Sequence, residues 1–144
     1  MPRDYRLFLD DILEAVAKIR EYTAGLDYSA FAQDSKTQDA VVRNLEIIGE
    51  AAGRLPESVR FEAPEIEWRK IVALRNILAH EYFGVSLPVV WDLVQNKIDS
   101  LESSCRTLLE HKSKKTNEDE EKSNAINTQT NTPQQRKSAG SNGL

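Results

Sequence analysis

Apolar residues recur at steps of three and four along most of the first 111 positions, which is the pattern of amphipathic helices. One stripe consists of Phe8, Ile12, Ala15, Ile19 and Tyr22, and Gly25 offers a stop for its helix. After the short stretch DYSAFAQD, a second stripe consists of Val41, Leu45, Ile48, Ala52 and Leu55, and Pro56 closes it. The pattern therefore predicts two long helices in the first half of the chain.

The second half continues in the same way. A loop with room for a short helix runs up to Pro64, and residues 66–81 predict a helix that Gly84 breaks. Its apolar stripe is Ile71, Leu74, Ile77 and Leu78. Ser86 is expected to cap the last helix, with Pro88 in its first turn. The last stripe is Val90, Val94, Ile98, Leu101, Cys105 and Leu108. The predicted fold is all-α, an up-and-down bundle of four main helices with additional short ones.

The final segment has a different composition. Residues 112–144 are rich in Asn, Gln, Ser, Thr and Lys, and their large apolar residues are Ile126 and Leu144 alone. So little apolar surface cannot offset the entropy of an ordered chain. We expect a helical domain over residues 1–111 and a disordered tail over 112–144, with a solvated extension favoured over a partner-binding tail.

Charge and cysteine content narrow the functional classes. Residues 1–111 carry 13 Lys and Arg against 19 Asp and Glu, which argues against a broad, non-specific nucleic-acid surface. Any phosphate chemistry would depend on a local site. The single cysteine, Cys105, cannot form a disulfide within the chain, and no apolar run approaches the ~20 residues of a membrane span. We therefore expect a cytoplasmic protein.

Small residues interrupt the second long stripe. Gly49 and Gly53 flank two alanines on a predicted helix, where each glycine costs about 1 kcal/mol relative to Ala. Close approach of another helix would offset this cost, and packing within the bundle is favoured over packing across a dimer. Upstream, Arg43 and Asn44 are interpreted as a solvated polar face.

The densest unusual chemistry lies between Leu74 and Gly84. His80 is the only histidine of the helical body, and helix geometry places it with Asn76 nearly opposite the centre of the apolar stripe. Arg75 and Tyr82 share a flank of that stripe. Around the helix axis, Arg75 lies about 140° from His80. A polar position for His80 disfavours the alternative of a core histidine.

Arginine and histidine together suffice for RNA cleavage without a metal ion. A base takes the proton of the ribose hydroxyl, the alkoxide attacks the adjacent phosphate, and Arg stabilises the developing charge. The chain has no Cys/His pairs at ligand spacing and no Gly-rich phosphate loop, so neither metal nor cofactor is expected. Because Arg75 and His80 diverge on one helix, a twofold dimer would bring two of each to a shared cleft.

The stretch Arg75-x4-His80-x-Tyr82 resembles the R-x4-H-x-Y motif of HepT-like proteins, a branch of the HEPN domain superfamily. The similarity extends over about residues 4–109, through YRLFLDDILEAVAKIREYT, TQDAVVRNLEIIGEAAGRLP and WRKIVALRNILAHEYFGVSLPVVWDLV. The tail lies outside it.

This resemblance implies a dimeric helical ribonuclease toxin of a HEPN/MNT (type VII) toxin–antitoxin pair. Its partner would be an MntA-like nucleotidyltransferase antitoxin that transfers AMP to the motif tyrosine. Carried over, Arg75 and His80 become the catalytic pair, Tyr82 the modified residue, and Asn76 a supporting residue. Two alternatives stay open: a non-catalytic helical partner of a nucleotidyltransferase that binds nucleotide or presents a substrate, and a purely structural helical dimer.

Overall fold

The computed structural model of the chain describes residues 4–80 and 86–110, without the side chains of residues 79 and 80. Within these ranges the regular structure is entirely helical. The predicted stop at Gly84 and the predicted tail over 112–144 lie outside the described residues. No helix in the described part of the chain is both long and apolar enough to span a bilayer.

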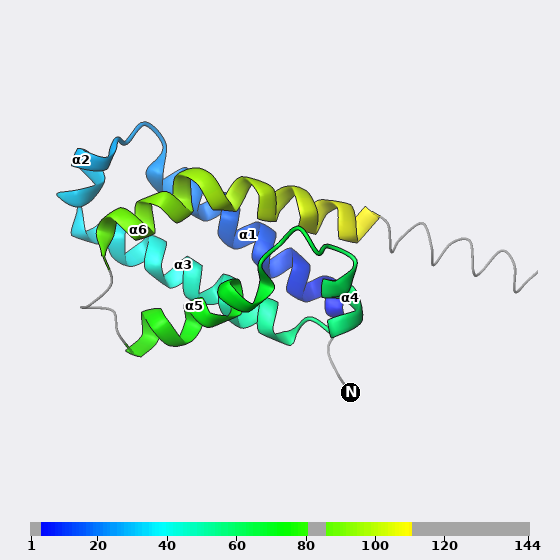
Figure 1. Cartoon of the computed structure of the whole chain (residues 1–144). Coiled ribbons are helices and arrows are strands. Elements are labelled where there is room, and N and C mark those ends of the chain that lie inside the picture. The colour runs from blue at the N-terminus through cyan, green and yellow to red at the C-terminus, as the bar shows by residue number, and fades with distance from the viewer. Residues whose placement is uncertain (1–3, 81–85, 111–144) are drawn as a thin grey trace, which may run out of the picture. The chain divides into compact units, whose positions relative to one another are not determined.

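Four long helices build the fold (Figure 1). They are α1 (Tyr5–Thr23), α3 (Ser35–Arg54), α5 (Trp68–His80) and a last helix that starts as α6 (Leu87–Asp92). The last helix continues through a π-helical turn, η2 (Leu93–Lys97), and α-helical residues 98–110. Two short helices, α2 (Tyr28–Ala32) and α4 (Glu57–Phe61), lie in the connections. Each long helix runs opposite to the preceding one, which is the predicted up-and-down arrangement.

Aspartates begin three of the helices. The side chains of Asp4, Asp27 and Asp34 accept hydrogen bonds from backbone N–H groups in the first turns of α1, α2 and α3. At the last helix Ser86 occupies the predicted N-cap position, but its side chain makes no capping hydrogen bond. Gly25 follows α1 with φ of 77°, a left-handed conformation that glycine adopts without strain.

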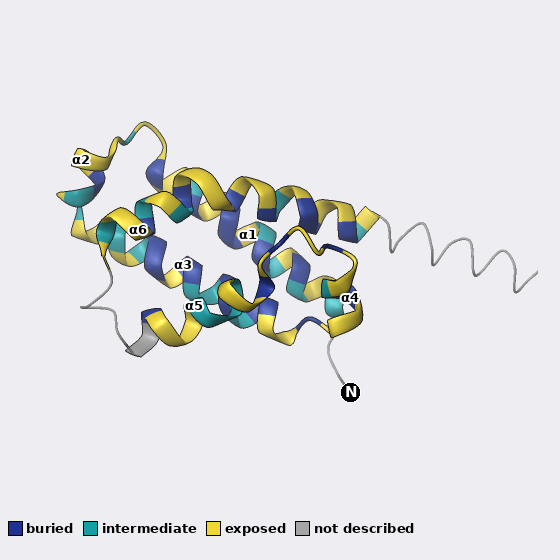
Figure 2. Cartoon of the chain, viewed as in Figure 1, coloured by how far each residue is buried: buried dark blue, intermediate teal, exposed yellow. Residues whose placement is uncertain are grey.

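The long apolar stripes form the core, and buried residues recur along α1, α3 and the last helix (Figure 2). Every residue predicted on the second and last stripes is buried: Val41, Leu45, Ile48, Ala52, Leu55, Val90, Val94, Ile98, Leu101, Cys105 and Leu108. Leu9, Ile12, Val16 and Ile19 complete the core from α1. The helical period thus identified most of the core correctly.

Two residues were wrongly assigned to the stripes. Tyr22 is 40% exposed, because the buried face of α1 ends on Thr23, whose hydroxyl donates to the Ile19 carbonyl (2.8 Å). Ile77 is 43% exposed, because it lies about 60° beyond Leu74 around α5, on the side turned away from α3. Both errors fall at the edge of a stripe.

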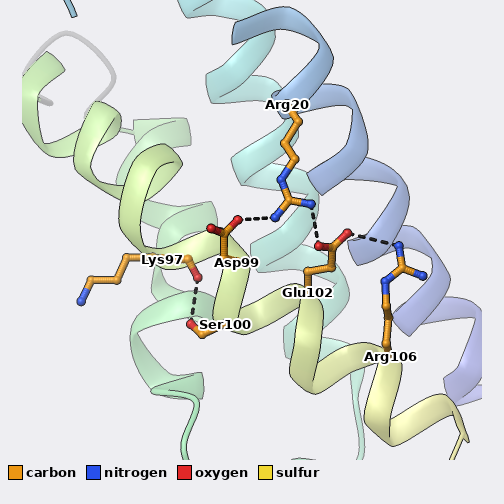
Figure 3. Close-up of polar contacts among 6 residues, drawn as sticks. All are labelled: Arg20, Lys97, Asp99, Ser100, Glu102 and Arg106. Carbon is orange, nitrogen blue, oxygen red and sulfur yellow. Dashed lines mark hydrogen bonds and ion pairs between the residues drawn. The ribbon is translucent and has the colours of Figure 1, made fainter. Parts of the chain in front are cut away.

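A polar bridge joins α1 to the last helix (Figure 3). The Arg20 guanidinium donates to Asp99 and, at 2.6 Å, to Glu102, which also accepts from Arg106 at 3.2 Å. These hydrogen bonds raise the pKa of Arg20, the one to Glu102 most strongly, and the bond from Arg20 holds the pKa of Glu102 below its ordinary value. The bridge fixes the last helix against α1 at one level of the bundle.

Candidate functional site

Gly49 sets the distance between α3 and α5. A Cβ atom at this position would lie 2.8 Å from the backbone nitrogen of Arg75 and 3.0 Å from the carbonyl oxygen of Ile71. The two backbones are therefore in direct contact, which confirms the prediction that small residues serve packing within the bundle. A Cβ at Gly53 would meet only Val72, at an ordinary 3.4 Å. The contact at Gly49 places Arg75 beside α3.

Arg75 is held at this position by a carboxylate. Its Nε lies 2.6 Å from Oε2 of Glu50, the residue after Gly49, while 60% of the Arg75 side chain remains exposed. The other oxygen of Glu50 accepts a hydrogen bond from Nη2 of Arg54 at 3.1 Å. One carboxylate thus bridges an arginine of its own helix and an arginine of α5. The result is a guanidinium that is oriented and accessible at once.

The Arg75 side chain borders an open hollow of about 520 Å³ between α1 and α3. Arg43 and Arg54 also line this hollow, as do the carboxylates of Glu46 and Glu50. A phosphate that enters it would meet arginines that are already paired, so binding would exchange a carboxylate for a phosphate at one or more guanidiniums. The arrangement suits reversible binding of an anionic ligand.

Asn76, the next residue on α5, lies close to Arg75. Both residues line a second hollow, of about 270 Å³, that also borders Gly49 and Gly53. The Asn76 side chain is exposed, as predicted. The structure therefore brings Arg75 and Asn76 to one surface depression, although helix geometry alone separates them by about 100°.

His80 and Tyr82 complete the predicted site, and α5 is helical through His80. The helical separation of about 140° between positions 75 and 80 therefore applies. The side chain of His80 and all of Tyr82 lie outside the described residues. Their placement relative to Arg75 stays a prediction.

Sequence reasoning missed Glu50 and misplaced Asn44. Asn44 is buried rather than solvated, because it lies three residues after Val41 and four before Ile48, on the apolar stripe itself. Its Nδ2 donates to the Ala40 carbonyl at 2.9 Å, while its Oδ1 has no partner among the described residues. Arg43, by contrast, is exposed as expected.

A signal for Glu50 was present in the sequence. Arg43, Glu46, Glu50 and Arg54 follow one another at steps of three and four residues, which indicates a face on α3 that carries charges of both signs. Two ion pairs form along this face, one between Arg43 and Glu46 (3.7 Å) and one between Glu50 and Arg54 (3.1 Å). The pattern does not reveal that Glu50 also reaches across to α5.

The described residues contain no group of three or more His, Cys, Asp or Glu side chains arranged to hold a metal ion. The polar chemistry that they bring together consists of guanidinium, carboxylate and amide groups. Such a set can bind and orient a phosphate ester, and it needs an added base to move a proton.

Comparisons with known proteins identify the family of the chain. The family model described as Ribonuclease HepT-like matches residues 12–108. A protein of Thermococcus cleftensis named as a probable ribonuclease HepT is 42% identical over 108 residues, covering 75% of this chain and 98% of that protein. A proposed RNase of Methanocaldococcus jannaschii is 43% identical over 99 residues, covering 68% of this chain and 82% of the relative.

A proposed RNase of Caldanaerobacter subterraneus is 34% identical over 105 residues, covering 73% of this chain and 94% of that protein. No solved structure matches the chain significantly. The family match covers α3, α5 and most of the first and last long helices, and it includes Arg75, Asn76, His80 and Tyr82. The chain therefore belongs to the HepT-like ribonuclease family.

Proposed function

We propose that this protein is a metal-independent endoribonuclease in which Arg75 and His80 are the catalytic residues. The observation that carries the proposal is the Arg75 guanidinium, which Glu50 holds at 2.6 Å beside an open hollow while most of the side chain faces solvent. A fixed, exposed guanidinium on a helix that also bears the only histidine of residues 1–110 suits phosphodiester chemistry.

The reaction follows from the two groups. The His80 imidazole takes the proton of a ribose 2′-hydroxyl, and the 2′-oxygen forms a bond to the adjacent phosphorus. The bond from phosphorus to the 5′-oxygen breaks, and that oxygen takes up a proton. Arg75 stabilises the negative charge that builds up on the phosphate oxygens, and Asn76 supports it from the neighbouring hollow. The expected products are a 2′,3′-cyclic phosphate and a 5′-hydroxyl end.

A homodimer would solve the geometric problem of the motif. Arg75 and His80 lie about 140° apart around α5, so one helix cannot easily direct both to the same phosphate. A twofold axis close to α5 would place the arginine of one protomer near the histidine of the other. Two equivalent composite sites would result.

Purified protein, assayed on RNA with and without EDTA, tests the catalytic proposal. Arg75→Ala and His80→Ala should each lower the cleavage rate by about a hundredfold or more, and EDTA should leave it unchanged. Arg106→Ala is the matched control, because its side chain is 62% exposed against 60% for Arg75 and it also pairs with a glutamate. Cleavage that persists without His80, or that disappears with the chelator, would contradict the mechanism.

The physiological role proposed here is that of a toxin controlled by an MntA-like nucleotidyltransferase. The Tyr82 hydroxyl would attack the α-phosphate of ATP, form a phosphodiester to AMP and release pyrophosphate. The attached nucleotide adds bulk and negative charge near Arg75, so that RNA is excluded.

Expression of the chain with and without that enzyme tests this role. Tyr82→Phe should keep toxicity but escape neutralisation, and intact-mass spectrometry should find AMP additions on the native chain only. Should the native chain bind the nucleotidyltransferase and yet neither cleave RNA nor arrest growth, the non-catalytic partner is the better description.

A further inference from the structure

A third hollow, of about 580 Å³, lies where α4 meets the start of α5. Arg60, Phe61 and Arg69 line it, and the Phe61 side chain is 85% exposed. The Trp68 indole N–H donates to the carbonyl oxygens of Arg60 (3.1 Å) and Ala63 (3.0 Å). These hydrogen bonds anchor the turn around Phe61 to α5, so the exposed ring sits on a fixed backbone.

The three hollows are linked by shared lining residues. The hollow beside α4 shares Val72 with the one over Gly49 and Gly53, and that one shares Glu50, Arg54 and Arg75 with the hollow between α1 and α3. From Arg69 to Arg75, α5 rises by only about 9 Å. A single extended ligand could therefore contact the Phe61 ring and the Arg75 guanidinium together.

The line is rich in arginine within an acidic domain. Among the residues that the structure describes, its lining includes five of the eight arginines and four of the 18 carboxylates. The arginines are Arg43, Arg54, Arg60, Arg69 and Arg75. The carboxylates are Asp11, Glu46, Glu50 and Glu57. No lysine in the described ranges lines the three hollows, so the cationic groups that these ranges contribute are all planar guanidiniums suited to phosphate oxygens.

We propose that this line of hollows, the arginine track, binds single-stranded RNA and leads it to Arg75. The inference rests on the proposed ribonuclease function and names the surface that holds its substrate. Guanidiniums along the track contact successive phosphates, and Phe61 offers its exposed face for stacking by an unpaired base. An exposed aromatic ring on a fixed backbone beside arginines fits an unstacked base better than a duplex, whose bases are already stacked.

Fluorescence anisotropy with a labelled single-stranded RNA of about a dozen nucleotides tests the track. All variants carry His80→Ala so that the RNA stays intact. Arg54→Gln should weaken binding and reduce the slope of log affinity against log salt by about 0.7, the share of one phosphate contact. Arg106→Gln is the matched control, because both arginines are 62% exposed and pair with a glutamate four residues earlier. It should change neither quantity.

Substitution of Phe61 tests the stacking contact. Phe61→Ala should weaken RNA binding about fivefold or more with little change in salt slope, and Phe61→Trp should retain or strengthen it. Tyr22→Ala removes another exposed aromatic side chain, on α1, and should have no effect. Because Phe61 is so exposed, the thermal midpoint of each variant should stay close to that of the parent.

The outcomes separate this inference from the proposed function. If the native protein cleaves RNA but the Arg54 and Phe61 variants bind RNA like their controls, the track is refuted and the function stands. If the native protein does not cleave RNA, yet these variants lose RNA binding, the function fails and the track stands. Normal RNA binding together with lost nucleotidyltransferase binding would overturn the track and assign the surface to a protein partner.

Discussion

At the scale of single residues, Glu50 has two opposing effects on the candidate site. Its carboxylate is bound to Arg75 and Arg54, so it orients the guanidinium that the proposed reaction needs. The same negative charge opposes an incoming phosphate. Orientation and affinity are therefore set against each other in one side chain.

Glu50→Gln should separate these two effects. Without the charged partner, Arg75 loses its fixed position, so kcat for RNA cleavage should fall about tenfold. One carboxylate fewer in the arginine track should lower KM. Steady-state kinetics measures both. Glu102→Gln also alters a carboxylate bound to two arginines, Arg20 and Arg106, and should change neither constant. A fall in kcat without a fall in KM would contradict the idea that Glu50 opposes phosphate binding.

At the scale of helices, the Arg20 bridge links α1 to residues 98–110 (Figure 3). Glu102 has the more buried side chain of that pair, at 20% exposed against 39% for Arg20. The pKa of Glu102 lies below its ordinary value of 4.5, chiefly because of the hydrogen bond from Arg20. A depressed carboxyl pKa stabilises the fold above the ordinary value, and this contribution is lost as pH falls through the depressed one.

Arg20→Met should therefore destabilise the protein in a pH-dependent way. Near neutral pH the free energy of unfolding should fall by about 1 kcal/mol or less, after allowance for solvent screening of the partly exposed pair. The difference from the native protein should shrink as pH drops below 4.5 and through the depressed pKa of Glu102, where the native carboxylate becomes protonated. Thermal or urea unfolding across this range provides the measurement. A difference independent of pH would show that the ion pair does not carry the effect.

At the scale of the whole molecule, the exposed face of α5 is the candidate dimer surface. Ile77 is 43% exposed beside the exposed Asn76, and a twofold axis near α5 would cover both. A second copy of the chain that packs on Ile77 would explain why an apolar side chain is exposed next to the proposed composite site.

Ile77→Glu should convert a dimer to a monomer and abolish RNA cleavage, because two buried carboxylates would face each other across the axis. Light scattering at micromolar concentration gives the mass. Val89→Glu charges a similarly exposed apolar side chain (55%) on α6 and should leave mass and activity unchanged. A native protein that is already monomeric, or a variant that stays dimeric and active, would contradict this assembly.

The sequence predicted the long helices well because their packing repeats at every turn. Val90, Val94 and Ile98 must all face the core, and each confirms the others through a shared spacing. Additional short helices were predicted, but the stretch that forms α2 was not assigned to one because a single turn contains no repeat. Its buried residue is Phe31, whose ring centroid lies 4.9 Å from that of Trp91. Polar caps could have signalled it, since Asp27 caps its first turn.

The site was less predictable than the core for a related reason. The contact between Glu50 and Arg75 depends on the relative position of α3 and α5, and no local pattern records that register. Gly49 indicates that another helix comes close, but the sequence does not identify that helix. The motif predicts which residues carry the chemistry, and the partners of Arg75 among the described residues emerge only from the packing.

The backbone contact at Gly49 has a consequence for genetics. If the protein arrests growth, cells that survive its expression will carry inactivating alleles, and missense changes at Gly49 should be frequent among them, although this residue has no functional group. A Cβ atom there would lie 2.8 Å from the Arg75 backbone nitrogen, so any other residue pushes α5 and its arginine away from Glu50. The codon of Gly53, whose Cβ would make only an ordinary contact, should tolerate alanine. Deep sequencing of survivors should then find missense changes enriched at Gly49 and not enriched at Gly53, one helical turn away.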